Sequence, residues 1–165
     1  YSYGLARNWE VSLQLPLAFD SRRAAKEGDR VELQYIAPHD EERGLYLGIN
    51  LELARDARIA EQHFWTVEII PIVGWRTGRW HFAANPGIER PLDGSHSAAT
   101  PAAKIAYGPA RSAVGLEYYS DPQGRTLYLA WDGKAGKSDL NLGIGRGLSG
   151  EADRWVLKAI YEIAF

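Results

Sequence analysis

Charged side chains recur at every second position of several apolar segments, and they are the residues best placed to do chemistry. Seven acids share this pattern with three bases of fixed charge: Glu10, Glu32, Glu52, Glu68, Glu117, Asp132 and Glu162 against Arg79, Lys104 and Lys158. His81 adds a side chain that titrates near neutral pH. Residues two apart point to the same side of a β-strand. One face would therefore carry an excess of negative charge and attract cations.

Uncharged polar residues extend the same face, at Gln14, Gln34, Asn50, Asn85, Tyr128 and Asn141. Two arrangements are open for such a face if it lies inside a narrow barrel. The side chains could line a water-filled passage, where the excess of carboxylates favours cations. They could instead pair with one another across the interior and fill it, as happens readily in small barrels.

No set of residues in the sequence fits an enzyme mechanism. The Ser-His-Ser run at 95–97 lies in an expected loop, where adjacent residues do not make an oriented nucleophile and base. The His-Asp-Glu-Glu run at 39–42 lies in an expected turn, and the four histidines share no metal-ligand spacing. Cysteine is absent from the sequence, which excludes disulfides and thiolate sites. We expect no enzyme, no cofactor and no metal.

Two glycine-rich segments imitate nucleotide-binding motifs without the necessary context. Residues 133–138 lack the first glycine of a phosphate loop, because Trp131 stands in its place, and no helix follows. Gly143, Gly145 and Gly147 belong to an expected strand, where glycine leaves room on the polar face. The 19 basic and 21 acidic residues are scattered, with a net charge of -2, and offer no basic face for nucleic acid.

The elements that must position these residues are β-strands, because apolar and polar residues alternate with a period of two. Ten strands are predicted, at residues 8–19, 31–37, 45–53, 65–75, 80–86, 101–107, 113–119, 125–132, 138–148 and 155–165. Tight turns such as 76–78, 108–110 and 132–137 alternate with looser connections at 20–29, 55–62, 89–99 and 148–153. That alternation is typical of an up-and-down antiparallel barrel of the outer membrane. We expect one all-β barrel domain over 1–165.

Aromatic residues on the apolar face favour lipid over a soluble core. The expected lipid-interface aromatics are Trp9, Phe19, Trp65, Trp75, Trp80, Trp131, Trp155 and Phe165. Three pairs of them are ten residues apart, which corresponds to roughly 25 Å along a barrel axis, the height of the apolar band between aromatic girdles. A soluble sandwich, the alternative, would bury this face. No apolar run reaches the roughly 18 residues of a membrane-spanning helix.

Closure of the sheet constrains the strand count. Inside a bilayer every backbone polar group must be paired, so a transmembrane sheet has to close on itself. Bacterial barrels have even strand numbers, which ten satisfies. Residues 1–5, however, read as the tail of an earlier strand followed by a turn at 6–8. The complete barrel is therefore expected to have twelve strands, with strand sequence missing before Tyr1.

Five segments carry a resemblance to a known family: YGL at 3–5 with WE at 9–10, IVGWR at 72–76, GLEYY at 115–119, LGIGRGL at 142–148 and DRWVLKA at 153–159. Together they make the chain similar to proteobacterial outer-membrane β-barrel proteins assigned as transporters. These are in turn distantly similar to the phenol meta-pathway degradation-like outer-membrane family. The resemblance implies transport of small molecules, aromatic ones among them, and it supplies no catalytic or binding residues.

These observations predict a bacterial outer-membrane barrel that acts as a narrow pore or channel for small polar or cationic solutes. The alternative is a non-conducting barrel that holds a partner protein or lipopolysaccharide. Outer-membrane lipid and lipopolysaccharide are the expected surroundings. The bacterial barrel assembly machinery is an expected partner, because a strand ending on Phe165 resembles the C-terminal signature that this machinery recognises.

Overall fold

The computed structural model describes residues 2–14, 17–20, 23–26, 28–40, 43–56, 64–94, 96–109, 111–122, 124–136, 138–149, 152 and 154–163. These residues form β-strands and the turns between them, and none of them belongs to a helix. Accordingly, no helix in this part of the chain is long and apolar enough to cross a membrane.

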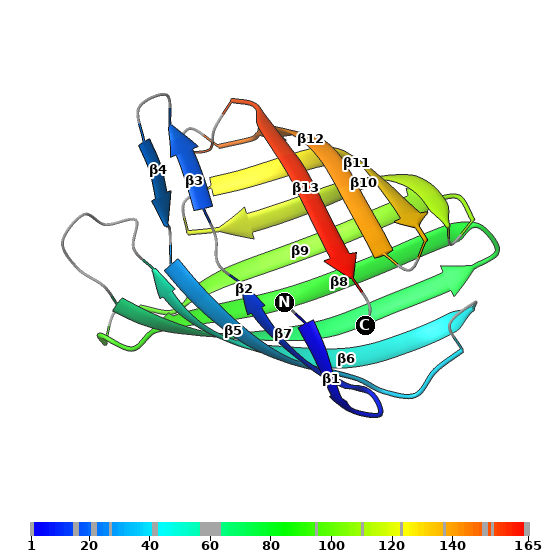
Figure 1. The fold of residues 1–165 in the computed structure, drawn as a ribbon, viewed down its shortest axis with the longest axis horizontal. Coiled ribbons are helices and arrows are strands. Elements are labelled where there is room, and N and C mark those ends of the chain that lie inside the picture. Colours follow the sequence, from blue (N-terminus) through cyan, green and yellow to red (C-terminus); the bar gives the residue numbers. More distant parts are fainter. Residues whose placement is uncertain are drawn as a thin grey trace.

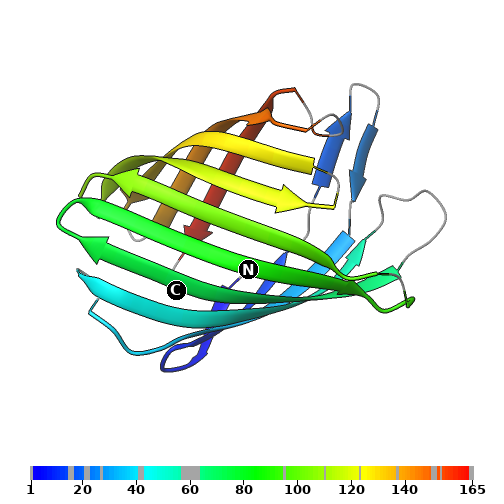
Figure 2. The same ribbon diagram turned by 180° about the vertical axis from the view of Figure 1, so that it is seen from behind.

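Eleven strands pair in one antiparallel, up-and-down sheet that curls around an interior (Figures 1 and 2). In pairing order they are β1 (Ser2–Ala6), β2 (Trp9–Gln14), β5 (Gly28–Ile36), β6 (Gly44–Asp56), β7 (Phe64–Thr77), β8 (Trp80–Pro91), β9 (Ala98–Tyr107), β10 (Ser112–Asp121), β11 (Gly124–Ala135), β12 (Ser138–Gly147) and β13 (Val156–Ile163). Every strand therefore pairs with its neighbour along the chain, apart from a hairpin inserted between β2 and β5.

That hairpin corrects the prediction of one continuous strand over residues 8–19. β2 ends at Gln14, and β3 (Leu17–Asp20) pairs with β4 (Arg23–Lys26) in a separate two-stranded sheet beyond β2 and β5 (Figure 1). Pro16 stands between β2 and β3 in the sequence, and proline has no N–H to donate to a ladder. The segment 20–29, expected as a loop, thus contains β4.

The other predicted strands are present, and several of them are longer than expected. β7 and β8 extend to the turn at Gly78, which has the positive φ of 59° that glycine adopts readily. β11 runs on to Ala135, so the turn lies at Gly136 and Asp132 is inside the strand. The expected tail of an earlier strand is β1, which pairs with β2.

The two faces of the sheet are inverted relative to a soluble protein. Leu51 and Leu53 are each 40% exposed, whereas Glu52 between them is only 7% exposed. The buried hydrophobic residues of the described chain are all alanines, at positions 54, 106, 113 and 130. The apolar stripe therefore covers the convex outer surface, and the polar face lines the concave interior. This arrangement disagrees with the soluble sandwich, whose core would be built from the apolar side chains.

The two outer strands of the sheet run in the same direction. β1 and β13 are the first and eleventh members of an antiparallel series, and no pairing between them is found in the described residues. Antiparallel pairing alternates strand direction, so β1 and β13 cannot pair with each other in that way. The curled sheet keeps an open seam between them.

Prolines lie at one level on three adjacent strands, and the pairing of β7 with β8 is interrupted there. The register of β7 with β8 sets Pro71 opposite Pro86, and Pro86 is paired with Pro101 on β9. Between Ile69 and Val73 the ladder of β7 with β8 has no paired residues. Proline supplies no amide hydrogen, which accounts for the break in an otherwise continuous pairing.

Two cross-strand glycines make room for tyrosines inside the curled sheet. The ring of Tyr46 lies against Gly74, and the ring of Tyr128 lies against Gly145, at the positions that a Cβ atom would occupy. Glycine was expected to leave room on this face, and at position 145 it does so for Tyr128. The large rings can consequently lie flat along the inner wall.

Candidate functional site in the concave interior

The interior collects most of the polar residues singled out in the sequence. Cross-strand pairing and burial place the following on the concave face: Glu32, Gln34, Asn50, Glu52, Glu68, His81, Asn85, Lys104, Glu117, Tyr128, Asp132, Asn141 and Lys158. Glu10 pairs with Gln34 on the same face but is exposed. Arg79 differs, because it lies exposed in the turn before β8. Gln14 and Glu162 lie in β2 and β13, and their side chains are outside the described part.

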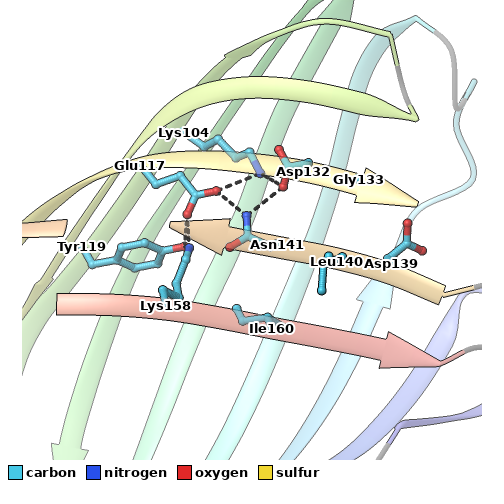
Figure 3. A pocket seen from close by; sticks show the side chains of 10 residues that line it. All are labelled: Lys104, Glu117, Tyr119, Asp132, Gly133, Asp139, Leu140, Asn141, Lys158 and Ile160. Carbon is cyan, nitrogen blue, oxygen red and sulfur yellow. Dashed lines mark hydrogen bonds and ion pairs between the residues drawn. The ribbon is translucent and has the colours of Figure 1, made fainter. Parts of the chain in front are cut away.

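Five of these residues form one charged cluster, which we call the lysine-carboxylate cluster: Lys104, Glu117, Asp132, Asn141 and Lys158 (Figure 3). They come from the five adjacent strands β9 to β13, and their side chains point toward one another. Glu117 is at the centre and is only 1% exposed. Its Oε1 lies 2.9 Å from Lys104 Nζ, and its Oε2 accepts a hydrogen bond from Lys158.

The remaining contacts complete the polar partners of this cluster. Lys104 Nζ also lies 2.7 Å from Asp132 Oδ1, and Asn141 Nδ2 donates both to Glu117 Oε1 (2.9 Å) and to Asp132 Oδ1 (2.8 Å). Two lysines thus face two carboxylates, which makes the cluster electrically balanced. Charges that are buried but paired and hydrogen-bonded are tolerated in an interior, so the cluster holds these five strands in one arrangement.

Tyr119 is part of this site although the sequence analysis did not select it. Its hydroxyl donates to Glu117 Oε2 (3.1 Å), and Lys158 Nζ lies 4.9 Å from the centre of its ring. The ring meets Tyr128 edge-on, with centroids 5.7 Å apart. The signal was present, because Tyr119 follows Glu117 by two residues and period two puts both on one face. A cavity of about 270 Å³ opens beside these residues.

A second group of charges has a different composition. Glu32, Glu52, Glu68 and Glu89 are direct cross-strand neighbours on β5, β6, β7 and β8, and we call them the acidic ladder. Side chains that are opposite each other in this way have Cβ atoms about 4.5–5.5 Å apart, and like charges there repel. Arg30 lies against this ladder, with its guanidinium 3.5 Å from Glu52. Glu89 had been expected in a loop, and β8 extends beyond it.

The acidic ladder borders a larger cavity of about 660 Å³ toward the end of the sheet that carries the longer connections. Glu52, Glu68 and Glu89 line it, together with Arg30 and Asp121. Thr100 donates a hydrogen bond to Glu68 Oε1. Part of the wall is apolar, from Ile70, Ile72 and three alanines. The interior therefore has an acidic chamber near one end and a balanced, tightly bonded cluster deeper inside.

No family model, curated protein or solved structure matches this chain. The interior and the outer surface therefore have to carry the functional argument. Among the described residues there is no group of three or more His, Cys, Asp or Glu side chains that could hold a metal ion. His96 lines the acidic chamber, while Ser95 of the weighed Ser-His-Ser run lies outside the described residues.

The outer surface carries an aromatic band near the end of the sheet with the tight turns. The ring of Trp9 is tilted against that of Tyr35, with ring centroids 4.8 Å apart. Trp80 lies 5.0 Å from Tyr107 and 6.0 Å from Phe82, which in turn lies 5.6 Å from Trp75. These contacts join side chains across β2 and β5, and again across β7, β8 and β9. Trp131 on β11 continues the band.

The opposite edge of the apolar surface has fewer aromatics within the described chain. Trp65 and Trp75 stand ten residues apart on β7, and both are exposed on the outer face as expected. Trp155 is exposed but precedes β13. Phe19 lies in β3 with its side chain outside the described part, and Phe165 is not described. One of the three ten-residue pairs is thus seen complete.

Proposed function

We propose that this protein is a transmembrane β-barrel of a bacterial outer membrane and forms a narrow pore for small polar or cationic solutes. The observation that carries the proposal is the inversion of the two faces, with leucines such as Leu51 exposed outside and carboxylates such as Glu52 buried inside. Soluble monomers rarely expose a continuous apolar surface of this extent to water. Lipid acyl chains, in contrast, are the natural surroundings of such a surface. The aromatic band near the tight turns fits a membrane interface.

The proposal requires the sheet to be closed by an odd number of further strands, of which one is the smallest number. β1 and β13 run in the same direction, so one strand antiparallel to both would fill the seam and give twelve. In a closed barrel the amide hydrogens of β1 and β13 are protected from exchange with solvent water. In an open sheet the amides on the unpaired side of each strand exchange rapidly, and hydrogen exchange in detergent micelles separates the two.

Cation preference follows from the acidic chamber. Its described lining contains four carboxylates, from Glu52, Glu68, Glu89 and Asp121, against one guanidinium from Arg30. An excess of one charge along a narrow, low-dielectric passage selects ions of the opposite sign. The deeper cluster is balanced and contributes little to this preference.

A second candidate function rests on that same cluster. Side chains from the adjacent strands β9 to β13 are bonded to one another along one part of the inner wall (Figure 3), and such a cluster could narrow or close the passage. The barrel would then act by holding a partner protein or lipopolysaccharide, without conducting ions.

Reconstitution in planar bilayers tests the pore. Steady openings with a reversal potential that favours K⁺ over Cl⁻ are expected in a KCl gradient. Glu68→Lys should shift that potential toward Cl⁻. Arg90→Glu changes the charge by the same amount on the outer face and serves as the control, which should leave the potential in place. A folded barrel that inserts and stays electrically silent contradicts the pore and supports the second function.

A further inference from the structure

One polar side chain in the acidic chamber has an atom without a partner. Asn50 is 7% exposed and lines the cavity between Gln34 and Ile70 in the cross-strand register. Its Oδ1 is buried and receives no hydrogen bond. A buried acceptor left unmade costs on the order of 1–3 kcal/mol. A ligand in the chamber that carries an N–H group could supply the missing donor.

The walls around Asn50 have two characters. Carboxylates of the acidic ladder, Glu52 and Glu68, are on one side, and Thr100 holds Glu68 by a hydrogen bond. Ile70 and Ile72 face the same space from β7. A hydrated metal ion gains nothing from the isoleucines, and the described residues contain no group of three metal donors. An organic cation matches both walls.

We propose that the acidic chamber binds a small organic amine cation, with N–H groups that reach Asn50 and the acidic ladder and methylene groups that lie against Ile70 and Ile72. A linear diamine fits this description. The proposal deepens the pore function, on which it rests for the route by which the amine reaches the chamber. No covalent step is involved, because the amine binds and leaves unchanged.

Isothermal titration calorimetry on the protein folded in detergent micelles tests the proposal, with 1,4-diaminobutane as the probe. Saturable binding of one equivalent is expected. Butane-1,4-diol has the same chain without charge and should not bind. The bis-quaternary analogue 1,4-bis(trimethylammonio)butane keeps both charges but has no N–H. It should bind at least about tenfold more weakly, a factor worth about 1.4 kcal/mol. Equal binding of the methylated compound would overturn the role of Asn50, and absence of diamine binding would overturn the site.

Three variants place the binding in the chamber. Glu68→Gln and Asn50→Leu should each raise the Kd of the diamine at least about tenfold. Asn50→Leu should not lower the thermal midpoint of unfolding, because it removes an unpartnered buried acceptor. Glu10→Gln is the matched control on the same face, away from the lining of the chamber, and should leave the Kd unchanged. A Kd that responds to Glu10 and not to Glu68 would contradict the location.

This test separates the amine site from the pore. Calorimetry needs no ion current, so a silent barrel that binds the diamine refutes conduction and keeps the site. A conducting barrel that shows no heat of diamine binding refutes the site and keeps the pore.

Discussion

Glu117 on β10 accepts a hydrogen bond from Lys158 on β13, and this contact therefore spans the two strands β11 and β12 that lie between them. Lys104 approaches the same carboxylate from β9. A single buried acid thus joins both sides of the C-terminal half of the sheet. Its removal should affect strands that it does not belong to.

Glu117→Ala should destabilise the folded protein by about 3–5 kcal/mol, because it leaves the largely buried Lys158 without its carboxylate partner and Lys104 with Asp132 alone. Reversible unfolding in urea, followed by tryptophan fluorescence in lipid vesicles, measures the change. Asp139→Ala is the matched control, since it removes a surface ion pair with Lys134 at 3.2 Å whose two side chains are about half exposed. That pair should contribute no more than about 1 kcal/mol. Equal losses would contradict a central role for Glu117.

Leu51→Arg should destabilise the protein in lipid by about 2–4 kcal/mol if the outer face meets the middle of a bilayer. Leu51 sits mid-strand between Leu33 and Ile69. Leu92→Arg changes a leucine that is more accessible, at 60% exposed against 40% for Leu51, but lies in the turn after β8, and it should have little effect. If both variants unfold at the same urea concentration as the parent protein, lipid does not cover Leu51.

If the protein spans a bilayer as proposed, Trp65 and Trp75 should lie near opposite interfaces of that bilayer. Variants that keep one of these tryptophans and carry Phe at the others allow each to be probed alone. Bromines near the lipid headgroups should quench either fluorescence more than bromines at the chain ends do, because both residues end the apolar face of β7. Stronger quenching of Trp75 by chain-end bromines would contradict the placement of the aromatic band at the membrane interface.

Gly74→Val should destabilise the sheet by about 1–3 kcal/mol through overpacking, because the ring of Tyr46 occupies the space of the new side chain. Adding Tyr46→Ala to this variant should recover part of the loss, as expected for two residues in contact. Gly4→Val adds the same side chain where nothing lies within 4 Å, and it should be tolerated. Additive losses in the double variant would argue against the contact.

The sequence was sufficient to predict the two faces, because alternation assigns each strand residue to a side without knowledge of its neighbours. The tight turn before β8 also makes the Glu68–Glu89 pair predictable, since a short turn fixes the register. Glu52 is brought opposite Glu68 across a long connection, and its register could not be read from spacing alone. The acidic ladder could therefore be recognised only in the folded sheet.

The lysine-carboxylate cluster could not be predicted from the sequence, for a related reason. Lys158 and Glu117 are separated by 41 positions and by two intervening strands, and their contact depends on the curvature of the sheet as well as on its register. Pro16 signalled the end of β2, but a single proline does not say that the following residues pair in their own hairpin. The missed Tyr119, in contrast, was within reach of simple period-two counting.

The row formed by Pro71, Pro86 and Pro101 weakens the backbone hydrogen bonding of the wall along one line. Amides are missing there from three neighbouring strands at one height, close to where Glu68 projects inward. Fluctuations of the wall would occur first along this row, and they would widen or narrow the interior next to the carboxylates while the strongly bonded strands β10 to β13 stayed in place.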